Sequence, residues 1–208
     1  MNLRDVIPTA ENSSNFDVVP ESITEVGTTL ENLKAAVCGE TGASAKYAAC
    51  AAAAKEQGFD QIARLFEATS AAEQIHIGLE AGVIAEIEPG YERPAAPEAE
   101  GIATDLNLIA GALGEIYETS DMYPSFIKVA QEEGNKKAEF VFTRAKLAEA
   151  VHAELYMDAY NNIDAPTDEA YYLCPICGYI PQGRRFREVP HLLHPGRQVP
   201  QVLSRPYA

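Results

Sequence analysis

The 208-residue sequence is poor in several residue types, and each shortage excludes a class of protein. It contains no tryptophan, and its four cysteines are too few for the disulfide framework of a small secreted protein. No apolar run approaches the roughly 20 residues that a membrane-spanning helix needs. The opening residues, Met1 to Asp5, show no apolar core of a secretory signal. We therefore expect a cytoplasmic protein without a membrane partner.

Positive charge is scarce as well. Lys and Arg together number 16 against 31 Asp and Glu, which gives a formal net charge of −15. Such a chain repels the phosphates of nucleic acids and the headgroups of anionic lipids. We therefore expect no nucleic-acid partner. The remaining composition, 47% hydrophobic and 23% charged, is typical of a globular chain with one full domain and a small appendage.

Apolar residues recur at three- and four-residue steps through four stretches, which predicts four long helices. The expected ranges are 24–57, 59–88, 102–133 and 134–163, and Pro124 is expected to kink the third. The acidic, Pro-rich residues 89–100 interrupt this pattern and predict a long connection between two helical hairpins.

The two hairpins repeat each other in sequence. Asn32-Leu33 with Gly39-Glu40 recurs 75 residues later as Asn107-Leu108 with Gly114-Glu115. Glu56-x-Gly58 recurs 76 residues later at Glu132-x-Gly134, and Glu73-x-x-His76 recurs with the same displacement at Glu149-x-x-His152. A one-residue insertion in the second hairpin reconciles the two displacements.

The repeated Glu-x-x-His motifs predict a metal site. A single copy is weak evidence, since Glu188-x-x-His191 also fits and contains Pro190, which excludes a helical site. The two repeated copies each place a carboxylate and an imidazole on one helix face. In an antiparallel bundle, Glu40 and Glu115 from the other two helices can meet them at the centre.

A buried group of carboxylates predicts bound cations. Four carboxylates in an apolar bundle core would repel each other and would be costly to desolvate, and two divalent cations remove that cost. One Glu from each of two helices and Glu-x-x-His from the other two is the pattern of ferritin-like di-iron proteins. The alternative interpretation, solvated glutamates and ordinary histidines, does not explain the matched repeat positions.

The repeat breaks at one carboxylate. Glu118 follows Glu115 by one turn, whereas the corresponding residue of the first hairpin is Ala43. We therefore expect an asymmetric site with a fifth carboxylate, in which Glu118 competes with His76 for one metal. Oxygen and nitrogen ligands of this kind suit iron or manganese, and zinc can also enter such a site.

Three stretches give the chain a specific resemblance to a known family. They read TLENLKAAVCGETGA, QIARLFEAT and GEIYETSDMYP, and they resemble the rubrerythrin family over nearly all of residues 1–183. That resemblance implies an all-α, ferritin-like four-helix bundle with one long crossover connection, followed by a small rubredoxin-like module, here incomplete. It also implies ligands of a di-iron centre at Glu40, Glu73, His76, Glu115, Glu118, Glu149 and His152.

The resemblance implies further roles and partners. Tyr47 and Tyr123 match the tyrosines that hydrogen-bond the carboxylates in the family. The implied activity is reduction of hydrogen peroxide to water in oxidative-stress defence, with electrons from NADH through rubredoxin or an NADH-dependent rubredoxin reductase. Glu118 and His76 are the expected catalytic residues, because Glu118 would replace His76 on one iron upon oxidation. The family forms homodimers. Two alternatives remain: a ferroxidase that handles iron, and a structural metal-binding dimer.

The expected domain organisation has four parts. Residues 1–21 would form an N-terminal arm, 22–163 the ferritin-like domain, 164–170 a linker, and 171–208 the rubredoxin-like module, altered after about residue 183. In that module Cys174-Pro-Ile-Cys177 supplies half of a four-thiolate iron site, and the sequence contains no second CxxC motif.

The residues after 183 suggest two explanations for the missing half. Codons that can encode Arg184 to His194 contain Cys-Pro-Ile-Cys when read one base later, so we expect a frameshifted rubredoxin half. The alternative is a zinc site in which His191 and His194 join the two cysteines.

Overall fold

The computed structural model describes residues 16–165 and 171–180. Its helices form a bundle, and the described residues contain no strand. The elements, in chain order, are α2 (Thr29–Glu56), α3 (Asp60–Ile87), α4 (Thr104–Tyr117), the π-helical turn η2 (Glu118–Met122), α5 (Tyr123–Glu132) and α6 (Lys136–Asn161). The all-α prediction is confirmed.

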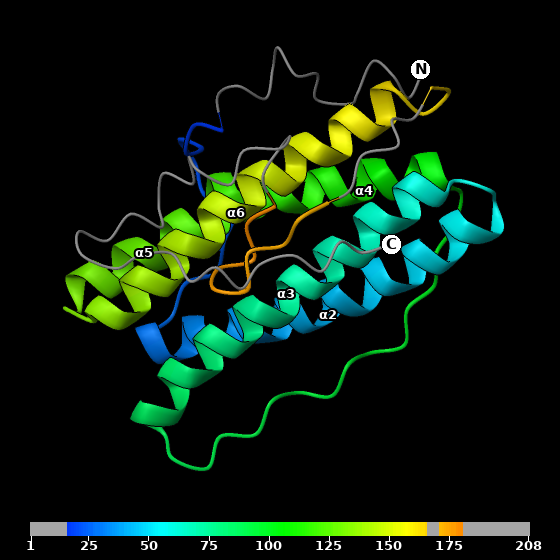
Figure 1. Ribbon diagram of the computed structural model, residues 1–208. Helices are drawn as coiled ribbons and strands as arrows, with labels where there is room; N and C mark the ends of the chain where they lie inside the picture. The colour runs from blue at the N-terminus through cyan, green and yellow to red at the C-terminus, as the bar shows by residue number, and fades with distance from the viewer. Residues whose placement is uncertain (1–15, 166–170, 181–208) are drawn as a thin grey trace.

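Two antiparallel hairpins make the bundle. Helix α2 packs along α3, and α6 packs along the broken helix formed by α4, η2 and α5 (Figure 1). The non-helical residues 88–103 run along the outside of the bundle from the end of α3 to the start of α4. This is the single long crossover connection that the Pro-rich stretch predicts.

Corresponding signals end the first helix of each hairpin. Gly58 and Gly134 occupy equivalent turns with φ of +84° and +73°, a left-handed conformation that favours glycine. At the other end of α2, Thr28 and Glu31 form a reciprocal capping box. Asn135 caps α6, because its side chain accepts a 3.0 Å hydrogen bond from the Ala138 amide. Local chemistry therefore fixes where the helices turn.

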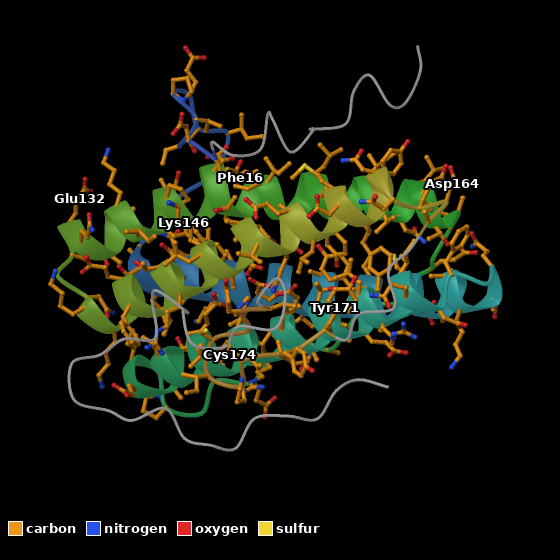
Figure 2. All side chains as sticks on the ribbon, turned by 45° about the horizontal axis from the view of Figure 1, so that its top comes forward. Phe16, Glu132, Lys146, Asp164, Tyr171 and Cys174 are labelled. Atoms are coloured by element: carbon orange, nitrogen blue, oxygen red, sulfur yellow. The ribbon has the colours of Figure 1, made fainter. Side chains whose placement is uncertain are left out.

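Two apolar clusters fill the bundle and leave a polar layer between them. One cluster is built around Phe66, Leu108 and Tyr156, and the other around Leu33 and Phe142. Along each long helix the residues of one cluster give way to buried Glu or His and then to residues of the other cluster. Figure 2 shows the side chains that crowd the space between the helices. The candidate site is this polar layer, closed at both ends by apolar packing.

The turn η2 accounts for the one-residue insertion between the hairpins. Tyr47 follows Glu40 by seven positions in α2, whereas Tyr123 follows Glu115, the counterpart of Glu40, by eight positions. A π-helical turn accommodates one extra residue within a helix, and η2 lies between those counterparts. The kink expected at Pro124 takes this form, with the proline in the first turn of α5.

The N-terminal segment holds η2 against the bundle. Asp121 of η2 is 4% exposed. Its carboxylate accepts hydrogen bonds from the Ser22 hydroxyl, from the Ile23 amide at 2.9 Å and from the Thr24 hydroxyl at 3.0 Å. The Val19 amide also donates to the Ser120 carbonyl at 3.0 Å. Residues 16–28 thus satisfy polar groups that the irregular helix leaves free.

The segment after the bundle differs from expectation in one respect. Strands and turns are expected from Tyr171 onward, but residues 171–180 contain a turn at 175–177 and no strand. A hairpin of the predicted rubredoxin-like module would stand alone in the described residues, and an isolated two-stranded hairpin is only marginally stable. None of the helices in the described ranges is long and apolar enough to span a bilayer.

We predict that Asp121→Ala releases the N-terminal segment. The substitution leaves three donors without their acceptor, and each lost buried hydrogen bond costs about 1 kcal/mol. Limited proteolysis should then cut within residues 16–28 faster than in the native protein, and urea unfolding should show a lower midpoint. Thr28→Ala, which removes only a helix cap, is the matched control. Equal cleavage rates in Asp121→Ala and native protein would contradict the anchoring role.

Candidate metal centre

Six buried side chains from four helices meet in the polar layer. Glu40 comes from α2 and Glu115 from α4, while α3 and α6 each contribute a Glu-x-x-His pair. All six are at most 1% exposed: Glu40, Glu73, His76, Glu115, Glu149 and His152. The i, i+3 spacing places each Glu and His of a pair on one helix face. The structure therefore brings together six of the seven predicted di-iron ligands.

These side chains form two groups of four that share two members. Glu73 and Glu149 belong to both groups, Glu40 and His76 complete one, and Glu115 and His152 complete the other. In each group the potential ligand atoms lie within 4.8 Å of one another. Glu73 and Glu149 could therefore serve both of two cations, and each cation would gain one further carboxylate and one imidazole.

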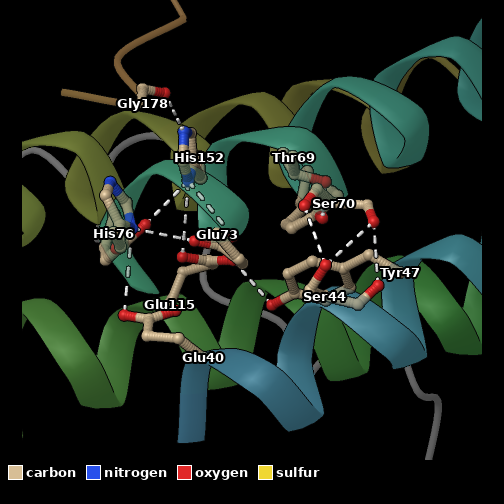
Figure 3. Close-up of polar contacts among 12 residues, drawn as sticks. Glu40, Ser44, Tyr47, Thr69, Ser70, Glu73, His76, Glu115, His152 and Gly178 are labelled. Carbon is tan, nitrogen blue, oxygen red and sulfur yellow. Dashed lines mark hydrogen bonds and ion pairs between the residues drawn. The ribbon is translucent and has the colours of Figure 1, made fainter. Parts of the chain in front are cut away.

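Glu149 lies between the two imidazoles. Its Oε1 is 2.7 Å from His76 Nδ1 and its Oε2 is 2.7 Å from His152 Nδ1. Glu73 Oε2 approaches His76 Nδ1 at 2.9 Å (Figure 3). The Nδ1 atoms of both histidines thus face the carboxylates, which identifies Nδ1 as the atom that each ring offers to a metal.

The opposite ring nitrogens bind backbone carbonyls. His76 Nε2 lies 3.0 Å from the Cys177 carbonyl oxygen, and His152 Nε2 lies 3.0 Å from that of Gly178. A carbonyl only accepts, so each Nε2 carries a proton and donates. In the neutral ring Nδ1 then keeps its lone pair and can ligate. These two hydrogen bonds select the tautomer that a metal requires.

The metal-free cluster is electrostatically unfavourable. Burial, followed by the negative charge of Glu149, raises the pKa of Glu40 to about 7 and that of Glu115 to about 8. Burial also opposes ionisation of Glu149, but the neighbouring His76 and His152 lower its pKa below the usual range. Both Nδ1 atoms are buried with only the site carboxylates as polar neighbours, and several carboxylate oxygens of the site lack a hydrogen-bond donor. Two divalent cations would satisfy these atoms, so the donor set fits a di-iron centre.

Two tyrosines hold the carboxylates from equivalent positions in the repeat. The Tyr47 hydroxyl donates to Glu115 Oε1 at 2.6 Å, and the Tyr123 hydroxyl donates to Glu40 Oε1. Each tyrosine therefore serves the carboxylate of the other hairpin. The structure places both next to the site, as the sequence predicts, where such bonds orient a ligand and tune its basicity.

Glu118 lies outside the two groups. It is half-buried at the first position of η2, and no group of close ligand atoms includes it. Burial, followed by the charges of Glu40 and Glu115, raises the pKa of the Glu118 carboxyl well above its usual range. The structure therefore places this predicted ligand beside the site carboxylates but in neither group.

A further buried carboxylate escaped the sequence interpretation. Glu80 follows His76 by one turn of α3 and is 1% exposed, with Oε1 3.0 Å from the Tyr123 hydroxyl. Burial, followed by the charge of Glu40, raises its pKa well above the usual range. The spacing Glu-x-x-His-x-x-x-Glu could have revealed it. The repeat could not, because the matching residue of the second hairpin is Tyr156.

The Cys174–Cys177 turn lies directly on the histidines. Gly178 permits this contact, since its φ is +74° and a Cβ there would lie 2.4 Å from His76 Nε2. Tyr171, Leu173 and Ile180 pack against the apolar cluster around Phe66. Figure 2 marks Tyr171 and Cys174 on this part of the bundle. The two carbonyl bonds and this packing seat the turn over α3 and α6.

The cysteines themselves do not complete an iron site. Their Sγ atoms are 3.5 Å apart, and the hydrogen bond from Cys177 lowers the pKa of Cys174 to about 6. A rubredoxin-like iron needs four thiolates. Cys38 and Cys50 lie in α2, and the described residues offer no group of three potential ligands around the turn. The frameshifted half, and the zinc site with His191 and His194, lie outside the described residues.

Comparisons with known proteins agree with this centre. The rubrerythrin family model matches residues 31–160. The chain is 63% identical to nigerythrin of Nitratidesulfovibrio vulgaris over 94% of this chain and 96% of that protein. It is 33% identical to rubrerythrin of the same organism, over 80% and 90% of the two chains. A nigerythrin structure in a mixed-valence state aligns with a TM-score of 0.81 at 64% identity, covering 94% of this chain and 96% of that chain.

We predict a steep pH dependence of stability for the metal-free protein. Glu40 and Glu115 have folded-state pKa values of about 7 and about 8, against 4.5 for an ordinary Glu. The folded state therefore binds protons more tightly, and this stabilisation is present below about pH 4.5 and is lost as pH rises through 7 and 8. One pKa unit is about 1.4 kcal/mol, so the free energy of unfolding should fall by several kcal/mol between about pH 5 and about pH 9. Urea titrations would measure it.

The iron-loaded protein is the control for that dependence. Bound cations replace the protons on these carboxylates, so its stability should vary far less over the same pH range. Parallel pH profiles for the loaded and metal-free forms would contradict the assignment of these carboxylates to the metal.

We also predict that Glu149→Gln prevents loading of both metals. The residue belongs to both groups, and an amide supplies neither the charge nor the second ligand oxygen. Metal analysis after anaerobic iron loading should fall from about two per chain to below about one. Glu40→Gln, which belongs to one group only, should retain about one iron. Glu67→Gln on the exposed face of α3 is the matched control, with circular dichroism to verify folding. Full loading of Glu149→Gln would overturn the bridging role.

Proposed function

Because the chain belongs to the rubrerythrin family, we propose that it is a non-haem di-iron peroxidase that reduces hydrogen peroxide to water. Family membership supports a di-iron oxidoreductase role in general, and a solved relative described as fully reduced and all-ferrous matches with a TM-score of 0.80. We further propose that hydrogen peroxide is the oxidant, that electrons come from NADH through rubredoxin-type carriers, and that the protein acts in the cytoplasm.

The observation that carries the proposal is a pair of adjacent, buried metal-binding groups whose histidines contact the Cys174–Cys177 turn. The two four-membered groups share Glu73 and Glu149, and both histidines extend the site to the Cys177 and Gly178 carbonyls. An iron store needs a path by which iron enters, and storage does not require a cysteine-containing turn in contact with both histidines. The contact therefore favours electron transfer over storage.

The residues of the site would have different roles in peroxide reduction. The irons, when bound, supply the electrons that reduce the O–O bond. Glu73 and Glu149 would fix the spacing of the metal pair, and the hydroxyls of Tyr47 and Tyr123 restrain the outer carboxylates. The apolar clusters on both sides keep bulk water out, which strengthens every charge interaction inside.

Glu118 is proposed to act by exchange with His76. Its position in a π-helical turn just beyond Glu115 leaves it close in sequence to the ligands and outside both groups. A half-buried carboxylate on an irregular turn can reorient at less cost than one on a regular buried helix. We propose that it joins one metal upon oxidation, and that electrons arrive from NADH through rubredoxin-type carriers to a homodimer.

Peroxide turnover in Glu118→Ala tests the assignment. We expect the variant to bind about two irons and to fold normally, but to reduce peroxide at least about tenfold more slowly with an excess of reduced rubredoxin. Glu67→Gln should match the native rate. Unchanged turnover in Glu118→Ala would exclude the exchange. In the native protein, fast oxidation of added ferrous iron with negligible peroxide turnover would favour a ferroxidase, and full loading with neither activity would favour a structural metal protein.

A further inference from the structure

The Cys174–Cys177 turn contacts the two histidines of the metal centre, but the described residues do not supply the other two thiolates of an iron–thiolate centre. Of the four cysteines in the 208 residues, Cys38 is exposed on α2 and Cys50 is buried in the apolar cluster there. Within the described ranges, the only groups of three or more potential metal ligands are the two around Glu73 and Glu149. The two cysteines therefore lie beside the candidate metal centre but belong to no group of metal ligands in the described residues.

Two adjacent thiols have a redox chemistry of their own. The sulfur atoms are 3.5 Å apart, and both cysteines are 1% exposed. The turn is closed by a hydrogen bond from the Gly178 amide to the Cys174 carbonyl at 3.0 Å and by one from the Cys174 amide to Tyr179 at 2.9 Å. Both sulfurs are thus held on one side of the turn. Side-chain rotation can bring them to the roughly 2 Å separation of a disulfide.

The position of this turn couples it to the metal-binding side chains. The Cys177 carbonyl accepts the proton of His76 Nε2, and the adjacent Gly178 carbonyl accepts that of His152 Nε2. Two consecutive peptide units that follow the Cys177 thiol therefore contact one imidazole of each metal group. The neighbouring Leu173 and Ile180 pack into the apolar core, so the contact is shielded from water.

We propose that Cys174 and Cys177 form a reversible dithiol–disulfide couple that stores two electrons for the metal centre, an inference that rests on the proposed peroxidase function. Closing the S–S bond releases two electrons and two protons. Reduction of one hydrogen peroxide consumes two electrons and two protons, breaks the O–O bond and yields two waters. An external dithiol of the thioredoxin or dithiothreitol class reopens the disulfide and is itself oxidised to a disulfide. The couple matches the electron demand of one peroxide.

The exposed residues of the turn define where the external reductant acts. Pro175 and Ile176 lie between the cysteines and are exposed, with Ile176 39% exposed. Both sulfurs are buried, so an attacking thiolate reaches one of them only when the turn between Pro175 and Ile176 shifts outward. The partner implied is a small thiol reductant or a redox protein that presents its own dithiol.

Peroxide stoichiometry of the iron-loaded full chain tests the couple. The protein is treated anaerobically with dithiothreitol, loaded with ferrous iron, freed of reductant and unbound iron, and titrated with hydrogen peroxide. The cysteines are then alkylated and mapped by mass spectrometry. Reduced iron and the dithiol each supply two electrons, so we expect consumption of about two peroxides per chain in the native protein. Consumption of the second peroxide should be accompanied by formation of a Cys174–Cys177 disulfide. Cys174→Ser should consume about one peroxide, and Cys38→Ser about two, as the matched control.

Metal-free protein separates this inference from the function on which it rests. Diamide, a thiol oxidant that needs no metal, should link Cys174 to Cys177 in that protein and leave Cys38 unlinked. A disulfide with diamide but no peroxide consumption by the loaded chain would overturn the peroxidase function and the coupling with it. Consumption of about one peroxide in both native protein and Cys174→Ser, with free thiols, would overturn the couple and leave the peroxidase standing. Iron or zinc bound to these thiols would also overturn the couple.

Discussion

The carboxylate of Glu149 between two histidine nitrogens is the interaction on which the rest of the molecule depends. Its oxygens lie 2.7 Å from Nδ1 of His76 and of His152. For a metal to bind, both nitrogens must present lone pairs, so both rings must carry their proton on Nε2. Those outward protons need acceptors in a buried place, and the Cys177 and Gly178 carbonyls are those acceptors. The position of the Cys174–Cys177 turn therefore matches the histidine tautomer that metal binding requires.

Much of the fold and the site was predictable because the chain repeats itself. Equivalent Glu-x-x-His motifs in two hairpins predict one face on each of two helices, and helix periodicity alone then directs Glu40 and Glu115 toward them. The same repeat relates Tyr47 to Tyr123, and in the structure each donates a hydrogen bond to a carboxylate of the other hairpin. The quoted stretches also resemble nigerythrin within the family, and the 63% identity confirms that likeness.

Other features depend on tertiary contacts that no local pattern encodes. Glu80 lies one turn after His76 in sequence, but the repeat gives it no counterpart, and its burial and its contact with the Tyr123 hydroxyl depend on the folded bundle. The contact of Gly178 with His76 joins residues 102 positions apart, so only the folded chain reveals why a glycine stands there. The π-helical turn was visible only as a mismatch of one residue between two repeat displacements, whose place in the helix required the structure.

That mismatch of one residue has a consequence for how such a molecule can arise. An extra residue in a packed helix normally rotates everything beyond it away from its partners. Here the extra residue is absorbed locally, because the Val19 amide donates to the Ser120 carbonyl of the irregular turn and the Asp121 carboxylate binds residues 22–24 against it. Tyr123 beyond the turn still reaches its carboxylate. A duplicated hairpin can therefore gain a residue and remain a hairpin, and its two copies become free to diverge in chemistry while sharing one architecture.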